Sequence, residues 1–268
     1  MARDDEGPAH AGAGNLIGTQ GLIEGQGTQC AACPLAACPG LRQPPEDLRQ
    51  WIAAFRQGEA RFLRGDHIFP QGAKPRHLYT ILSGVLMRTR LLDDGRRQII
   101  NFMFPGDFIG LQGALDAEMG HGVEAVTPAR LCAFPRERFF DMVTSQPRLA
   151  FDLTWLAAHE EAALEEHIVS LGQRNARERM AALAVFLMQR GLDTGMVSEG
   201  TLSIGITQSQ IADMLGLSLV HTNRTLQALR RHGLVDWTMG GIRVPDMDAV
   251  RSFAKIEDSG QSAQRRYI

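Results

Sequence analysis

The stretch Thr207-Gln-Ser-Gln-Ile-Ala-Asp-Met-Leu-Gly-Leu-Ser-Leu-Val-His-Thr-Asn-Arg224 decides the fold of the C-terminal part of the chain. Thr207 and Gln210 form a capping box that predicts a helix start, and Gly216 supplies the left-handed turn that ends this helix. Ser218 is a natural N-cap for a second helix. Two short helices joined by a tight glycine turn predict a helix-turn-helix, and residues 233–244 predict a two-stranded wing behind it.

The second helix divides into an inner and an outer stripe. The inner stripe repeats at helical spacing and consists of Leu219, Thr222, Leu226 and Leu229. The outer stripe suits base reading, because arginine grips guanine, asparagine and glutamine pair with adenine, and valine meets a thymine methyl group. The alternative is a helical hairpin with a solvated polar face. The predicted DNA contacts are Val220, His221, Asn223, Arg224, Gln227 and Arg230.

Upstream, from about residue 60 to residue 135, short apolar runs alternate with glycine turns. Leu78-Tyr-Thr-Ile-Leu-Ser-Gly84 and Gln98-Ile-Ile-Asn-Phe-Met-Phe104 are examples, and Asp93-Asp94-Gly95 is a typical hairpin turn. Regularly spaced short strands with such turns predict an antiparallel sandwich or a barrel-like roll.

A long helical stretch follows, from about Pro147 to Leu171, and carries two apolar stripes. Such a helix can pack on the roll with one stripe, formed by Leu149, Leu153 and Leu156, and on a second subunit with the other. The alternative is one wide face buried within a single chain. On the first interpretation the dimer interface comprises Ala157, Glu161, Leu164, Ile168 and Leu171. A capping box at Asn175 predicts the next helix, which is expected to stop at Gly191.

Three of the four cysteines stand close together in Cys30-Ala-Ala-Cys33-Pro-Leu-Ala-Ala-Cys38, and the fourth is Cys132. So little chain separates the three that their thiols can converge on a metal ion or an iron–sulfur cluster. A zinc site is an alternative because zinc accepts four thiolates in the same geometry, and thiol oxidation in a redox sensor is another. The predicted metal ligands are Cys30, Cys33, Cys38 and Cys132.

Composition narrows the class of protein. Apolar residues make up 44% of the 268 residues and charged residues 22%, as in ordinary globular proteins. The net charge is −2, but basic residues exceed acidic ones in the C-terminal third, where DNA contacts are predicted. The sequence shows neither a membrane-length apolar run nor a leader, which predicts a cytoplasmic protein without a membrane partner. No arrangement of nucleophile and base points to an enzyme.

The order of roll, long helix and winged helix-turn-helix resembles the CRP/FNR superfamily of bacterial transcription regulators. The resemblance covers nearly the whole chain from residue 46, and it is carried by Leu82-Ser-Gly84, Pro105-Gly-Asp107, Asn175-Ala-Arg-Glu-Arg179 and Gln210-Ile-Ala-Asp-Met-Leu-Gly-Leu217. It implies an α+β fold with an N-terminal cyclic-nucleotide-binding-like β-roll, a long dimerisation helix and a C-terminal winged helix-turn-helix. The expected divisions are a disordered tail at 1–29, a cysteine cluster-binding segment at 30–45, the roll at 46–146, the dimerisation helix and hinge at 147–174, the DNA-binding domain at 175–258 and a tail at 259–268.

The cysteines resemble those of the FNR branch, which holds an oxygen-labile [4Fe-4S] cluster on three N-terminal cysteines and one in the roll. This resemblance implies an oxygen-responsive regulator whose cluster favours a homodimer bound to double-stranded DNA at a two-fold symmetric TTG-type site. RNA polymerase would be a further partner if the protein activates transcription. Two departures stand out. Four residues separate Cys33 and Cys38 where well-known FNR proteins have five, and Val220-His-Thr-Asn-Arg224 replaces the common Glu-x-x-Ser-Arg.

Cyclic nucleotide binding is not expected. In CRP-type pockets a Gly-Glu-Leu segment binds the ribose and an Arg-Ser pair binds the cyclic phosphate. The corresponding stretches here are Ile109-Gly-Leu-Gln-Gly113 and His121-Gly122, which lack both the acid and the arginine. A phosphodiester buried without a cation would be poorly compensated.

Overall fold

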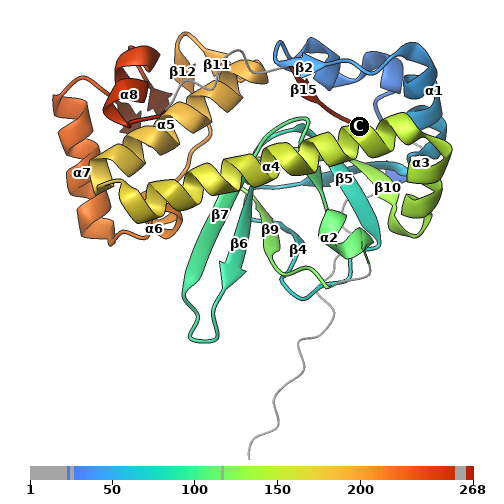
Figure 1. Ribbon diagram of the computed structural model, residues 1–268, viewed down its shortest axis with the longest axis horizontal. Coiled ribbons are helices and arrows are strands. Elements are labelled where there is room, and N and C mark those ends of the chain that lie inside the picture. The colour runs from blue at the N-terminus through green and yellow to red at the C-terminus, as the bar shows by residue number, and fades with distance from the viewer. Residues whose placement is uncertain (1–22, 25–26, 116–117, 257–263) are drawn as a thin grey trace, which may run out of the picture.

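The computed structural model describes residues 23–24, 27–115, 118–256 and 264–268, arranged along one long helix (Figure 1). This helix, α4 (Pro147–Gln173), has the strands of the roll on one side and the C-terminal helices beside its far end. Most of the predicted N-terminal tail lies outside the described residues. Within them, no helix combines the length and the apolar character needed to cross a membrane.

The roll consists of two antiparallel sheets around an apolar core, as predicted. Its strands turn alternate side chains inward, so that Ile81, Leu86 and Met103 are buried together. The sheets have the orders β1-β3-β10-β5-β8 and β4-β9-β6-β7, and the short helix α2 (Leu111–Ala114) follows β8. The strands are β1 (Ile23–Glu24), β3 (Gly58–Phe62), β4 (His67–Phe69), β5 (His77–Ser83), β6 (Leu86–Leu91), β7 (Arg97–Met103), β8 (Phe108–Ile109), β9 (Gly122–Ala125) and β10 (Ala129–Pro135).

The cysteine segment forms two 3-10 turns, at Cys30–Ala32 and Pro34–Ala37, before strand β2 (Leu41–Arg42) and helix α1 (Glu46–Phe55). Acidic residues in the first turn of α1 stabilise this helix, because their negative charges interact favourably with the partial positive charge at its N-terminus. Its apolar face packs into a second buried cluster, together with side chains of α3 (Phe139–Ser145) and the start of α4.

The predicted C-terminal tail, 259–268, is not a free end over its last residues. Strand β15 (Arg265–Arg266) pairs in parallel with β2, and the side chains of Tyr267 and Ile268 are buried. The sequence did not predict this pairing, because it joins segments that are distant in the chain and no local pattern encodes such a contact.

Helix α5 (Ala176–Asp193) begins at the predicted capping box. Asn175 accepts a hydrogen bond from the Glu178 amide, and the Glu178 carboxylate accepts one from the Asn175 amide at 2.9 Å. The helix continues past Gly191, which was predicted to end it. A Cβ atom on Gly191 would lie 2.8 Å from Cδ1 of Leu202, so this glycine allows close packing instead of stopping the helix.

The predicted helix-turn-helix is confirmed. Helix α6 (Gln208–Leu215) is capped by Thr207 and ends at Gly216, whose φ of 64° lies in the left-handed region, and Ser218 caps α7 (Leu219–Arg231). The wing is larger than predicted, since its two strands belong to a four-stranded sheet of order β11-β12-β14-β13. The remaining elements are β11 (Val197–Ser198), β12 (Thr201–Leu202), β13 (Asp236–Thr238), β14 (Gly241–Arg243) and α8 (Met247–Phe253).

One apolar core joins the roll to the DNA-binding unit. Met87 and Phe102 of the roll belong to the same buried cluster as Met180 of α5 and Met214 of α6. Side-chain packing therefore fixes the orientation of the helix-turn-helix relative to the roll in this structure.

Candidate functional site

Helix α7 presents the predicted base-reading stripe to solvent. Val220 is 62% exposed, the side chains of His221, Arg224 and Gln227 are also exposed, and Asn223 is half-buried. The inner stripe is buried at Thr222, Leu226 and Leu229, but Leu219 is 53% exposed, so its assignment to that stripe was wrong. Leu219 opens the helix, and a helical side chain leans toward the preceding turn, which is absent at the first position.

The N-terminal end of α7 borders a surface hollow of about 420 Å³ that contains Val220, His221 and Arg224. Arg177 of α5 lies in the same hollow and was not among the predicted contacts. In the sequence, Arg177 is recognisable only as a residue in the first helical turn after Asn175. That position does not predict that Arg177 lies near α7. At the other end of α7, Arg230 lies 3.1 Å from Asp236, so this predicted contact is paired within the chain.

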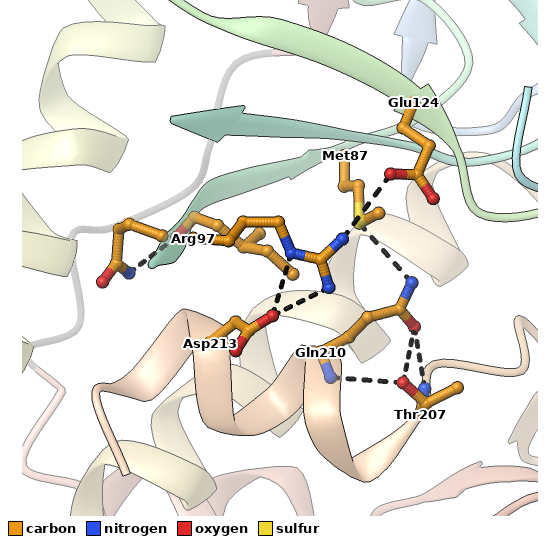
Figure 2. Close-up of polar contacts among 8 residues, drawn as sticks. Met87, Arg97, Glu124, Thr207, Gln210 and Asp213 are labelled. Atoms are coloured by element: carbon orange, nitrogen blue, oxygen red, sulfur yellow. Dashed lines mark hydrogen bonds and ion pairs between the residues drawn. The ribbon is translucent and has the colours of Figure 1, made fainter. Parts of the chain in front are cut away.

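The first helix of the pair, α6, is held against the roll (Figure 2). Arg97 of β7 donates from Nε and Nη2 to the same carboxylate oxygen of Asp213, at 2.9 and 2.8 Å, and lies 3.6 Å from Glu124. Gln210 completes the cap with Thr207 and directs its amide nitrogen to the sulfur of Met87 at 3.5 Å. These contacts fix α6 on the roll while α7 keeps its outer face open.

The four predicted ligands come from two parts of the chain that meet in one apolar cluster. Cys132 of β10 is 6% exposed within this cluster, and the half-buried Cys30, Cys33 and Cys38 pack against it. Across the described residues, however, no three His, Cys, Asp or Glu side chains are positioned to share a metal ion. The structure gathers the thiols without placing them in ligand geometry.

Two anchors hold the cysteine segment in place. At its start, the Thr28 amide donates to Oε1 of the fully buried Glu59 at 2.6 Å. At its end, the Gly40 amide donates to the carbonyl of Asp193 in α5 at 2.8 Å, and a Cβ atom on Gly40 would lie 2.5 Å from that of Asp193. The thiol of Cys38 lies 3.5 Å from the Thr194 carbonyl. The segment therefore bridges the roll and the C-terminal end of α5.

Burial dominates the protonation of the thiols. It raises the pKa of Cys132 to about 12, although Arg56 beside it acts in the opposite direction. Burial likewise raises the pKa of Cys30, Cys33 and Cys38. The thiols are thus held as neutral SH groups unless a cation stabilises the thiolate form.

Comparison with known proteins shows the family. A cyclic nucleotide-binding domain matches residues 59–146, and a Crp-like helix-turn-helix domain matches residues 178–253. Nitrogen fixation regulation protein FixK of Bradyrhizobium diazoefficiens is 31% identical over 236 residues, which cover 87% of this chain and 97% of FixK. The chain belongs to the CRP/FNR family. Transcriptional activator protein FnrL of Cereibacter sphaeroides is 28% identical, with 77% of this chain and 84% of FnrL covered.

The structure of FixK2 from Bradyrhizobium japonicum has the same fold, with a TM-score of 0.65 over 76% of this chain and 98% of that one, at 23% identity. The chain is therefore a DNA-binding transcription regulator of the FixK and FNR type within the CRP/FNR family. Of these relatives, FixK is a nitrogen fixation regulation protein and FnrL is a transcriptional activator.

Between the roll and α4, this CRP/FNR chain has a pocket of about 440 Å³ that contains Arg88, His121 and Arg265. Both arginines already face carboxylates, since Arg88 lies 3.5 Å from Glu160 and Arg265 lies 2.8 Å from Asp107. Both guanidinium groups among the described lining residues are therefore paired within the chain, and the absence of cyclic nucleotide binding stays a prediction.

The two apolar stripes of α4 differ in how deeply they are buried. The first stripe is buried on the CRP/FNR roll, with Leu149, Leu153 and Leu156 at most 5% exposed. In the second stripe Ile168 is 68% exposed, Ala157 and Glu161 are exposed, and Leu164 and Leu171 are half-buried. A single chain thus leaves this stripe uncovered, and its role in a dimer stays a prediction.

Proposed function

We propose that this protein is an FNR-like regulator whose dimerisation and DNA binding respond to oxygen through a [4Fe-4S] cluster on Cys30, Cys33, Cys38 and Cys132. The observation that supports the proposal is the gathering of all four thiols, from the N-terminal segment and from β10, in one apolar cluster. Thiolate ligands in an apolar, partly water-excluded setting fit an iron–sulfur site.

The bound cluster would supply redox chemistry that oxygen can disrupt, while the chain's own residues supply the response. Because burial raises the pKa of each thiol, the neutral form prevails until a metal stabilises the thiolate. Since the described sulfurs are not in ligand geometry, the cysteine side chains, or the short 3-10 turns that carry them, must move when a metal binds.

That rearrangement would directly affect the position of α5 in the DNA-binding unit. Gly40 and Cys38 contact the carbonyl groups at the end of α5, so a change in the cysteine segment moves a surface on which α5 rests. Regulators of this family bind DNA and act as dimers. A dimer through the second stripe of α4 would offer two α7 helices to a two-fold symmetric site, whereas a monomer offers one.

The test is the metal and sulfide content of protein purified without oxygen. A [4Fe-4S] cluster predicts about four irons and about four sulfides per chain, with broad visible absorption that bleaches in air. Replacing any one of the four cysteines by alanine should remove most of this absorption. Colourless protein with about one zinc per chain would contradict the proposal and favour a structural zinc site. A disulfide in the air-exposed protein without bound metal would favour a thiol-redox site.

A further inference from the structure

The last five residues of the chain lie against a docking surface that comprises β2, Asp107 and Asp152 of α4. Figure 1 shows β15 beside β2, next to α4. Parallel pairing places Arg265 beside Leu41 and Arg266 beside Arg42. The Arg265 amide donates to the Gly40 carbonyl at 2.9 Å, and Gln264 Nε2 donates to the Pro39 carbonyl at 3.3 Å. The C-terminal peptide therefore pairs, as an added strand, with the backbone of the residues that follow Cys38.

Two ion pairs fix the middle of this peptide. Arg265 lies 2.8 Å from Asp107, a 5% exposed carboxylate that Arg190 of α5 also binds at 2.7 Å. Arg266 forms an ion pair with the buried Asp152 of α4, and its guanidinium lies 4.8 Å from the ring centre of Phe151. Nearly buried carboxylates are stabilised by such partners, so the docking surface offers a favourable contact to each of the two basic side chains.

The end of the peptide is apolar and inserted. Tyr267 is 6% exposed and Ile268 is 5% exposed, and both belong to the cluster against which Cys30, Cys33 and Cys38 pack. Charge, backbone pairing and apolar burial thus all favour one occupant, a peptide in which two basic residues precede an aromatic and an aliphatic residue.

We propose that this docking surface is a binding site for the chain's own C-terminal peptide, and that the bound peptide limits the access of thiol reagents to Cys30, Cys33 and Cys38. The peptide holds the strand after Cys38 in place and covers the apolar side of the segment. When the peptide leaves, the segment loses this strand partner and opens more often, and the reactivity of a half-buried thiol follows the population of the open form. The proposal holds whichever metal the thiols bind.

Thiol alkylation tests the proposal. Reduced, chelator-treated full-length protein and a variant that ends at Gln264 are treated with N-ethylmaleimide, and the rate at each cysteine is followed by mass spectrometry. Truncation should raise the rates at Cys30, Cys33 and Cys38 several-fold. A synthetic peptide of residues 264–268 should slow alkylation of the truncated chain again, whereas the same peptide with both arginines replaced by glutamate should not.

Point variants cover the case in which truncation disturbs folding. Arg266→Asp should raise alkylation, and adding Asp152→Arg should restore protection because the pair is reversed. Arg90→Glu makes a comparable charge change at an exposed position of β6 and should leave the rates unchanged. Equal rates in the wild type, the folded truncated chain and Arg266→Asp would overturn the proposal, as would failure of the peptide to protect the truncated chain.

Discussion

Arg224 is the side chain on which we expect sequence preference to depend most. It is exposed on the outer face of α7 beside Val220 and His221, and a guanidinium at this position can grip guanine in the major groove. Arg177 lines the same hollow from α5, and we expect it to contact the DNA backbone instead. Substitution of the two arginines should therefore affect DNA binding in different ways.

We expect Arg224→Ala to reduce the preference for a TTG-type duplex over a scrambled duplex by about 1–3 kcal/mol. Arg177→Ala should weaken binding to both duplexes alike, because a phosphate contact carries no sequence information. Fluorescence anisotropy with the two duplexes measures both effects. Retention of full preference by Arg224→Ala would refute the base-contact assignment.

His121 should make the folded protein sensitive to acid. Burial, together with the smaller effect of Arg88, lowers the pKa of His121 to about 3, whereas an unfolded histidine has a pKa of about 6.5. Between these values the unfolded chain binds the proton that the folded one excludes, so stability falls as the pH falls. His121→Gln should remove up to about 1.4 kcal/mol per pH unit from this slope.

Denaturant unfolding at about pH 7 and about pH 5 measures the contribution of His121. His67→Gln, at an exposed position of β4, is the matched control and should keep the wild-type slope. An unchanged slope in His121→Gln would show that other groups cause the acid sensitivity.

Residues that act on their immediate neighbours could be predicted from the sequence. The caps Asn175, Thr207 and Ser218 were recognisable because a cap bonds amides two or three residues away. Arg177 and Tyr267 were not, because their roles depend on elements that are distant in sequence. Gly191 was misjudged for the same reason, since its partner Leu202 is on another element.

At the scale of elements, α4 carries the surface that we expect to contact a second subunit. Its second stripe is the exposed apolar one, and Ile168 is the most exposed large apolar side chain of that stripe. The two stripes could be predicted because helical periodicity is local. The pairing of β15 with β2 and the docking of α6 on β7 could not, because contacts between distant segments leave no periodic pattern.

We expect Ile168→Glu to weaken the dimer of the cluster-bound protein by about 3 kcal/mol, or roughly a hundredfold in the dissociation constant, because it would bury an unpaired charge. Ala162→Glu adds the same charge to an exposed position of α4 outside the stripe and should have little effect. Analytical ultracentrifugation under anaerobic conditions measures the dimer dissociation constants of the two variants. Equal dimer dissociation constants for both variants would contradict the prediction that α4 forms the dimer interface.

At the scale of the whole molecule, the cysteine segment is the junction between three parts. It is tied to the roll through Glu59, to α5 through Asp193 and to the C-terminal peptide through β2. The roll and α5 share an apolar core, and a packed core does not deform piece by piece. On the proposed function, we expect a change at the four thiols to alter the orientation of α7.

The most direct test of this account is the affinity of one anaerobic preparation for a two-fold symmetric TTG-type duplex, measured before and after exposure to air. The account predicts that the dissociation constant rises at least about tenfold as the visible absorption bleaches, because the dimer and its second half-site contact are lost. An unchanged dissociation constant after complete bleaching would contradict it.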